Sequence, residues 1–349
     1  QGVRPPRRGA GRPGSPEGAF AIILRNAATP KHLSIATLMV LLTAVISVFI
    51  GVSNVSPATL LSGSADSQTL HVLLVSRIPR TLAIVLAGGS MAVVGMIMQL
   101  LARNNFVEPS TAGTIEAATL GLLVVAILAP GMPVMGKMVV ASLFALAGTA
   151  LFLRILRLAP LRSVLVAPLI GIMLGGVIGA VTTFFAYRLD LLQSLNSWMT
   201  GSFAGVLRGR YELLWLSFVL MLVAYIAADR FTVAGMGQDF TTNLGMNYNR
   251  VWALGLIIVA LVSSVVVVTV GMIPFLGLVV PNVVRTIFGD NMRRSTPWVV
   301  VFGAGFMLIC DIIGRTLRYP YEIPVGVVVG VVGSVLFLYI LLRKDAHVA

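Results

Sequence analysis

The chain has few charged residues, few histidines and almost no cysteine. Its 349 residues include 1 Cys and 3 His, and Asp and Glu together number only 12. A single cysteine cannot build a disulfide framework, and the histidines are too scattered to form the spaced ligand set of a metal site. Charged residues make up 11% of the chain, too few for the surface of a soluble globular protein. We therefore expect neither a disulfide-stabilised secreted domain nor a metal site within this chain.

Long apolar runs fill most of the sequence instead. Hydrophobic residues account for 58% of the chain, and the mean hydropathy is +0.98. A helix of about 20 apolar residues crosses a hydrocarbon core about 30 Å thick. The pattern predicts an all-α polytopic membrane protein with about ten transmembrane helices, of which residues 274–288 form only a partial helix. The predicted segments are residues 33–51, 79–101, 111–129, 134–153, 164–187, 212–228, 251–272, 274–288, 296–314 and 323–342.

Basic residues outnumber acidic ones, and their distribution predicts the orientation of the chain. The 25 Lys and Arg residues give a formal net charge of +13. Because no soluble basic domain is present, we expect the chain to contact the lipid bilayer and no nucleic acid. With both termini cytoplasmic, about two thirds of the basic residues lie on the cytoplasmic side, which the positive-inside rule favours. Residues 1–31 are then a disordered basic cytoplasmic tail, and residues 32–345 a single transmembrane domain.

Small residues recur at close spacing in several predicted spans. Gly171, Gly175 and Gly179 lie on one face of the fifth span. Glycine lets helix backbones approach closely, which supplies the attraction that lipid cannot. These residues are therefore expected to mark helix packing. Related spacings occur at Gly88, Ala92 and Gly95, and at Gly326 and Gly330.

Residues 131–138 imitate a phosphate-binding loop but lack its chemistry. Such a loop follows a strand and needs Ser or Thr after its lysine to hold magnesium. Here Met138 follows Lys137, between two apolar segments. The sequence also lacks a zinc-protease helix motif, a nucleophile-elbow motif and a credible catalytic triad. We therefore expect no catalytic residue and no enzyme activity in this chain.

Four stretches stand out from the apolar background. The first places two arginines at the mouth of the second span, and arginine is costly near lipid unless it has a partner. The second is a polar turn before the third span, the third is a polar insert after the sixth, and the fourth surrounds the short eighth segment. In order they are Arg77-Ile-Pro-Arg80 with residues 88–99, Arg103-Asn-Asn-Phe-Val-Glu-Pro109, residues 237–245, and residues 271–285 with 311–315 and 322–326.

Together these stretches resemble the FecCD-type permeases, the membrane subunits of ABC importers for iron-siderophores, haem and vitamin B12. The resemblance covers about residues 35–343, and four motifs in the same order make it specific. It implies a type II ABC importer permease fold in a bacterial cytoplasmic membrane. The implied partners are a second permease, two cytoplasmic ATPase subunits and an extracytoplasmic substrate-binding protein. ATP and magnesium then belong to the ATPases, so no cofactor is expected in this chain.

The resemblance implies that arginines on the outer surface meet acidic residues of the binding protein. The matching positions are Arg77, Arg80 and Arg315. Arginine suits this role because its charge is permanent and its planar group can grip a carboxylate with two hydrogen bonds. Two alternatives remain open. Arg77 and Arg80 could anchor the helix by extending toward the membrane surface, and Arg315 could pair with Asp311 one helical turn earlier.

The polar insert resembles the family's coupling loop, two short helices that sit in a cleft on the ATPase. It covers about residues 234–247, interrupts the apolar pattern and lies on the predicted cytoplasmic side. The alternative is an ordinary connecting loop. The residues expected to contact the ATPase are Gly237, Gln238, Asp239, Thr241, Asn243, Leu244 and Gly245.

Polar residues inside the spans are candidates for the translocation path. Glu116 lies within the third span, where a carboxylate is costly and usually faces the bundle interior or water. Thr114 lies nearby, and Gln99 lies in the second span. We expect these three residues to line the path. The alternative for Glu116 is a buried structural acid.

The sequence departs from the usual family pattern at four places. Asn105-Phe106 replaces Pro-Leu, Gln238 replaces Glu, Asn282 replaces His, and Ser334 replaces Pro. We expect the changed positions to face the cytoplasm or another subunit. The second permease could then be a copy of this chain or a paralogous chain.

Residues 104–114 resemble the branch for catechol-type siderophores more than the cobalamin branch. The expected function is import of a ferric siderophore by alternating access, driven by the partner ATPases. A vitamin B12 or haem importer is the alternative within the class. The alternative from another class is a transporter driven by an ion gradient with Glu116 as proton carrier, and the polar insert at residues 237–245 speaks against it.

Overall fold

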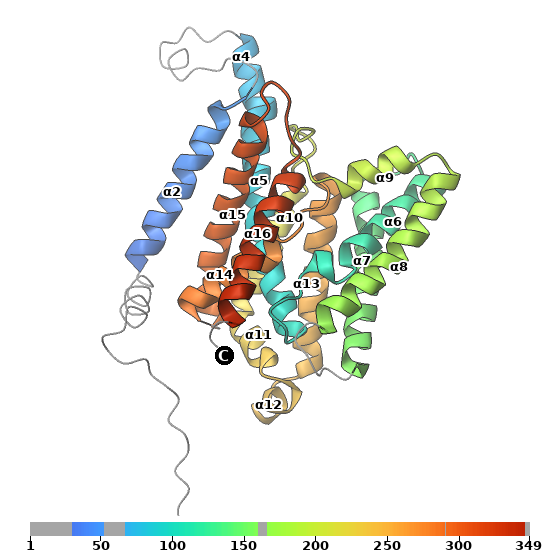
Figure 1. Cartoon of the computed structure of the whole chain (residues 1–349), viewed down its shortest axis with the longest axis vertical. Helices are drawn as coiled ribbons and strands as arrows, with labels where there is room; N and C mark the ends of the chain where they lie inside the picture. The colour runs from blue at the N-terminus through green and yellow to red at the C-terminus, as the bar shows by residue number, and fades with distance from the viewer. Residues whose placement is uncertain (1–29, 52–66, 160–165, 290, 346–349) are drawn as a thin grey trace, which may run out of the picture.

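The computed structural model describes residues 30–51, 67–159, 166–289 and 291–345, which form helices joined by short connections (Figure 1). The predicted tail lies almost wholly outside the described residues. The helices are α2 (Pro30–Phe49), α4 (Ser67–Val72), the π-helix η1 (Leu73–Arg77), α5 (Ile78–Leu101), the 3-10 helix η2 (Pro109–Thr111), α6 (Thr114–Leu128), α7 (Val134–Leu158), α8 (Val166–Arg188), α9 (Leu192–Met199), α10 (Leu214–Ile226), α11 (Ala228–Gly235), α12 (Gln238–Asn243), α13 (Tyr248–Thr269), α14 (Leu276–Phe288), α15 (Met292–Thr316) and α16 (Val325–Asp345).

Helix α5 forms the centre of the bundle. Nearly every residue from Ala83 to Gln99 is buried, and α5 packs against α13, α14 and α15. Helices α6 to α9 form a second group, joined to the first through α13, which packs against both α5 and α7 (Figure 1). The small residues of α5 permit this packing, because a side chain at Gly88 would come within 2.7 Å of the Gly303 carbonyl oxygen.

Several hydroxyl groups inside the bundle are satisfied within their own helices. Ser90 donates to the Leu86 carbonyl at 2.7 Å, Thr119 to Ile115 at 2.9 Å, and Ser264 to Ala260 at 2.7 Å. A polar group in an apolar interior is costly without a hydrogen bond. Bonding to the carbonyl four residues earlier therefore lets these residues sit in membrane helices without a partner helix.

The helices correspond to the predicted spans. Seven are long and apolar enough to cross a membrane, and the pair α10 and α11, bent by 65°, makes an eighth. Helices α6 and α14 are shorter apolar helices. Each predicted segment matches one of these elements, so the predicted polytopic helical architecture is confirmed. Helix α14 has 13 residues and is about 20 Å long, which makes it the partial helix that was predicted.

The second span begins earlier than predicted, at Ser67 in place of residue 79. Helix α4 runs through η1 directly into α5, so Pro79 lies near the start of α5. Proline has no N–H to donate to the carbonyl of Val75 four residues before it. That carbonyl instead accepts a hydrogen bond from the backbone N–H of Arg208 at 2.9 Å. The connection before α10 thus stabilises the helix where proline would interrupt it.

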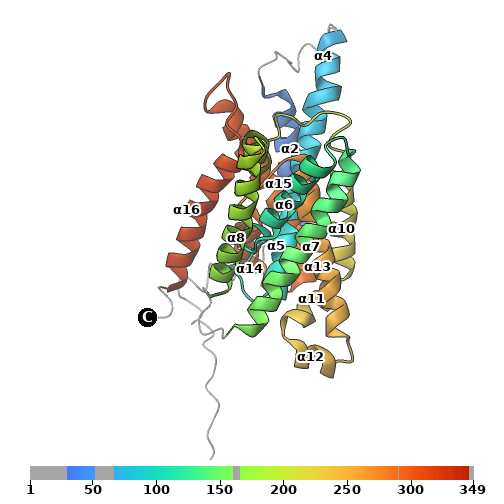
Figure 2. The same cartoon turned by 90° about the vertical axis from the view of Figure 1, so that its right-hand side faces the viewer.

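The bundle has two distinct ends, called upper and lower as Figure 1 draws them. The upper end carries α4, η1, α9 and the connection between α15 and α16. The lower end carries α11 and α12, of which α12 lies beyond the ends of the long helices (Figures 1 and 2). The first described residue of α2 and the last of α16 also lie at the lower end. The candidate site residues gather at these two ends.

Candidate functional site

Five charged residues form an upper charge cluster: Arg77, Arg80, Asp311, Arg315 and Glu322. The Nη1 of Arg80 donates to both carboxylate oxygens of Glu322, at 3.0 and 2.8 Å, and its Nη2 donates to Asp311 Oδ1 at 2.8 Å. Arg315 Nη2 lies 2.6 Å from Asp311 Oδ2. Asp311 therefore bridges two arginines, and the cluster joins α5, α15 and the connection before α16.

The same cluster holds the upper end of α2. Arg315 Nη1 donates to the carbonyl oxygens of Ser47 at 2.9 Å and Ile50 at 2.7 Å, and its Nη2 donates to the Ser47 hydroxyl. Arg77 Nη1 also donates to the Ile50 carbonyl. The last carbonyls of a helix lack partners within the helix, so arginine donors complement them. The cluster therefore ties four segments of the chain together.

Burial in the cluster is uneven. The side chains of Asp311 and Arg315 are 1% and 2% exposed, and that of Arg80 is 12% exposed, whereas Glu322 is 27% exposed. Arg77 and Arg80 therefore have partners within the chain, which simple anchoring at the membrane surface does not require. The i,i+4 pair of Arg315 with Asp311 is confirmed. With three arginines and two carboxylates, the cluster has one uncompensated positive charge.

At the lower end, the predicted coupling residues lie on and around α12. Gly237 begins this helix with φ +121°, a conformation that favours glycine. Thr241 is fully buried and donates to the Val233 carbonyl of α11 at 3.2 Å, which ties α12 to the preceding helix. Exposed apolar side chains, Phe240 at 48% and Leu244 at 57%, face away from the bundle. The remaining predicted residues, Gln238, Asp239, Asn243 and Gly245, are exposed.

The three predicted path residues are not brought together. Gln99 is buried between α5 and α14, where its Nε2 donates to the Gly277 carbonyl at 3.3 Å. Thr114 is buried between α6 and α7 and shares a 2.7 Å hydrogen bond with Thr149. Glu116 lies between α6 and α8, where a side chain at Gly175 would come within 3.3 Å of its carboxyl carbon. No donor among the described residues reaches the buried Glu116 Oε2.

The second and fourth sequence motifs bind each other inside the chain. Glu108 is buried in the connection before α6, and its Oε1 accepts a 2.8 Å hydrogen bond from the Phe275 backbone N–H at the start of α14. Asn282 Nδ2 donates to the Asn105 carbonyl at 2.7 Å, and Arg285 Nη1 donates to the Asn105 side chain. The structural role of Glu108 was not predicted, although a carboxylate between two apolar runs was the available signal.

These contacts correct one expectation about the departures from the family pattern. Phe106 is 8% exposed and Asn282 is 9% exposed, so neither faces the cytoplasm or another subunit. The Asn282 side chain instead donates to the backbone carbonyl of Asn105, a group that any residue at that position would present. The substitution at Asn282 therefore has a partner within one chain.

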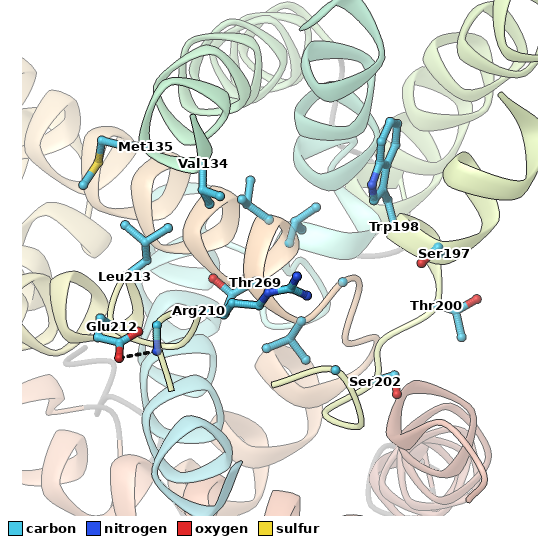
Figure 3. Close-up of a pocket in the computed structure, with 16 residues that line it drawn as sticks. Val134, Met135, Ser197, Trp198, Thr200, Ser202, Arg210, Glu212, Leu213 and Thr269 are labelled. Carbon is cyan, nitrogen blue, oxygen red and sulfur yellow. Dashed lines mark hydrogen bonds between the residues drawn. The ribbon is translucent and has the colours of Figure 1, made fainter. Parts of the chain in front are cut away.

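A cavity of about 890 Å³ opens at the upper end, among α7, α9, the connection before α10 and α13. Trp198, Ser197 and Thr200 lie on one side and Glu212 on the other, with its carboxylate accepting the Gly209 N–H at 2.7 Å (Figure 3). The cavity presents the Arg210 guanidinium and several hydroxyls beside an aromatic ring (Figure 3). No predicted site residue lines it. Helix α9 itself was missed, although Leu191, Leu195 and Trp198 follow helical spacing.

Comparison with known proteins agrees with this architecture. The family model of the FecCD transport family matches residues 38–343. The chain is 48% identical to a petrobactin import system permease protein of Bacillus subtilis over 89% of this chain and 98% of the relative. It is 41% identical to a ferric-anguibactin transport system permease protein of Vibrio anguillarum, over 78% and 86% of the two chains. A solved metal-chelate type ABC transporter in an inward-facing conformation matches with a TM-score of 0.76 and 25% identity, over 90% of this chain and 100% of that one.

The helices, the motif positions and the relatives agree with one another over nearly the whole chain. A match to 306 residues is far more than half of the sequence, since the family model begins at residue 38 and ends at residue 343. The apolar helices make the protein a multi-pass protein of the cytoplasmic membrane. The chain belongs to the FecCD transport family and is a permease subunit of an ABC importer, a transporter component and not an enzyme.

Proposed function

We propose that this permease imports a ferric siderophore, with the catechol type favoured, together with a second permease, two ATPases and a substrate-binding protein. Support for the substrate comes from the relatives named for petrobactin and ferric-anguibactin. In this proposal the upper end faces outward and the lower end faces the cytoplasm. That orientation places both ends of the described chain on the cytoplasmic side, in line with the distribution of basic residues.

The observation that carries the proposal is the position of α12. Helix α12 lies beyond the long helices (Figure 1), carries the exposed Phe240, is followed by the exposed Leu244, and is tied to α11 through the buried Thr241. Exposed apolar side chains on a projecting, fixed element are typical of a surface that another protein covers. We propose that the ATPase covers them, so that its nucleotide-driven motion is transmitted through α11 to α5 and α13, against which α11 packs.

Replacing Leu244 by glutamate is expected to weaken assembly with the ATPase by about tenfold or more, because a carboxylate would then be buried against the partner. The measurement is co-purification of the two subunits and the ATPase rate in the complex. Leu317→Glu is the matched control, since Leu317 is also exposed, at 72% against 57% for Leu244, but lies at the upper end. Normal assembly and coupled uptake in Leu244→Glu would contradict the proposed coupling role.

We propose that the upper charge cluster is the docking site for the binding protein. Its excess positive charge is complementary to an acidic surface, and charge complementarity mainly sets association rate and specificity. Arg80 is the best-placed docking residue, because it is more exposed than Arg315 and lies beside the exposed connection before α16. Arg77 and Arg315 both donate to the Ile50 carbonyl at the upper end of α2. In this proposal they hold α2 beside the docking site and also add to its positive charge.

We propose that the substrate crosses along the exposed face of α8 and α16, where a second permease would complete the wall. Figure 2 shows both helices toward the left-hand side of the bundle, while Figure 1 shows α8 at the right-hand edge and α16 nearer the centre. Both present exposed apolar side chains, including Met173 and Val177 on α8 and Val331 on α16. Of the three predicted path residues, Glu116 lies nearest to this wall, because it packs against Gly175 of α8.

The substrate is tested by titrating the cognate binding protein with ferric catecholates, other ferric chelates, haem and cobalamin, and by uptake of each into vesicles that contain the full complex. We expect saturable uptake of a ferric siderophore that requires ATP. Uptake of cobalamin or haem alone would support the alternative substrates. Uptake that persists with an inactive ATPase and follows an ion gradient would contradict the ABC mechanism.

A further inference from the structure

We propose that Glu322 holds Arg80 in the undocked permease and gives it up when a carboxylate of the binding protein arrives. This inference rests on the proposed docking role of the upper charge cluster. Both oxygens of Glu322 already occupy Arg80 Nη1, at 3.0 and 2.8 Å. They occupy one of the nitrogens that an acidic partner would need, since a carboxylate grips a guanidinium through paired hydrogen bonds from two nitrogens. Glu322 is therefore an internal substitute for the partner's carboxylate.

Asp311 and Glu322, the two carboxylates of the cluster, differ in how easily each can break its contact with Arg80. Asp311 is 1% exposed and binds both Arg80 and Arg315, so its loss would leave two buried guanidinium groups uncompensated. Glu322 is 27% exposed and binds Arg80 at the edge of the cluster. A partly exposed side chain can return to water at little cost. Glu322 is therefore the exchangeable ligand and Asp311 the permanent one.

The backbone around Glu322 is fixed, so the exchange needs only a side-chain rotation. The Ile323 N–H donates to the Gly314 carbonyl at 2.9 Å, and the Tyr321 N–H donates to the Arg318 carbonyl at 2.9 Å. These bonds hold the connection on both sides of Glu322. The connection itself is exposed, with Tyr319 at 62% and Tyr321 at 70%. An approaching protein therefore meets this connection beside Arg80.

Charge balance favours the exchange. The cluster carries one excess positive charge, which attracts an acidic partner. Once a carboxylate of the binding protein reaches Arg80, it repels the carboxylate of Glu322. That repulsion favours the departure of Glu322, which is more exposed than Asp311. Arg80 Nε is buried, with no hydrogen-bond partner among the described residues, so an incoming oxygen must take the Nη1 donor that Glu322 now holds. The expected result is a weaker but more selective docking site, because only a partner that outcompetes Glu322 binds.

The test is the affinity of the ATPase-bound permease complex for its substrate-loaded binding protein. Glu322→Gln is expected to lower Kd about fivefold, because the competing ion pair is lost. Glu212→Gln is the matched control: Glu212 is also an acidic residue of the upper end, but it caps Gly209 and does not touch Arg80. That control removes the same charge and is expected to change Kd less than twofold. Glu322→Asp, whose shorter side chain reaches Arg80 poorly, should lie between wild type and Glu322→Gln.

An unchanged or raised Kd in Glu322→Gln would overturn the inference, since a raised value would mean that Glu322 orients Arg80 for the partner. An equal gain in affinity in Glu212→Gln would also overturn it. The loss of any negative charge at the upper end would then explain the tighter binding, whether or not that charge contacts Arg80. Arg80→Gln separates this failure from that of the docking proposal. If Arg80→Gln leaves Kd unchanged, docking at the cluster is wrong. If it weakens binding while Glu322→Gln has no effect, only the exchange is wrong.

A spin label at Tyr319→Cys gives an independent readout, because the chain's single native cysteine, Cys310, is buried. Because the backbone of this connection is held on both sides of Glu322, Glu322→Gln is expected to leave the label spectrum of the undocked complex unchanged, and docking is expected to lower the mobility of the label in both proteins. A label whose mobility does not change on docking would contradict contact between this connection and the binding protein.

Discussion

Replacing Gly95 by alanine is expected to prevent the permease from folding into a stable bundle. Helices α5 and α14 cross with their backbones in contact at this point. A Cβ atom on Gly95 would lie 2.0 Å from the Gly277 carbonyl oxygen and 2.2 Å from its Cα atom. These are backbone atoms, so no side-chain rotation can relieve the clash. The two helices would have to separate, and the polar contacts beside the crossing would separate with them.

The contacts at risk include the Gln99 hydrogen bond to Gly277 and the Glu108 bond to Phe275. Forced overpacking typically costs about 1–3 kcal/mol, and breaking buried polar contacts adds to it. The measurement is the yield of monodisperse protein and its thermal unfolding in detergent. Gly176→Ala is the matched control, because nothing lies within 4 Å of a Cβ atom at that helical position. A Gly95→Ala protein as stable as this control would refute the close packing of α5 and α14.

The helical spans could be predicted from the sequence because each is determined locally. A run such as Tyr248–Thr269 is long and apolar enough to require a helix in lipid whatever surrounds it. The coupling element was found for a related reason, since polar residues interrupt the apolar pattern there. Helix α9 was missed because its 8 residues are too few for a span and its turns bury only one face.

The partners of the charged residues could not be predicted, because they are distant in the sequence. Arg80 and Glu322 are separated by 242 positions, and no local pattern indicates such a pair. The i,i+4 pair of Asp311 and Arg315 was foreseen, since helical geometry alone places these residues together. Thus the sequence indicated which charged residues are candidates for the upper charge cluster but not which residues of the chain pair with Arg80.

The spacing of small residues also predicted packing only in part. Gly171 meets the Thr111 carbonyl, where a Cβ atom would lie within 1.9 Å, and Gly175 meets Glu116. Gly179 completes the same spacing, yet nothing lies within 4 Å of a Cβ atom there. The glycines of α8 therefore allow close backbone approach only in its first half, although Thr182 and Ala186 are buried in its second half. Repeated spacing identifies a face that allows close approach, but the neighbouring helix must run alongside for that approach to occur.

Replacing Asp311 by asparagine is expected to have the largest effect of any charge substitution in the chain. Asp311 bonds to Arg80 at 2.8 Å and to Arg315 at 2.6 Å, and its side chain is 1% exposed. Without its charge, two buried guanidinium groups face each other with only Glu322 as a counter-ion. Removing one partner of a buried ion pair typically costs about 3–5 kcal/mol, because the remaining charge stays desolvated. We expect a large fall in the thermal unfolding temperature.

Asp229→Asn provides the matched control for this prediction. Asp229 pairs with Arg293 at 2.5 Å, but both side chains are more than half exposed, at 58% and 57%. Water screens that pair, and its loss should leave the unfolding temperature nearly unchanged. The comparison sets a buried carboxylate that pairs with two arginines against an exposed one that pairs with one, and both variants remove a single negative charge. Equal unfolding temperatures in the two variants would mean that water reaches the upper charge cluster. In that case Arg80 could bind a partner's carboxylate without displacing Glu322.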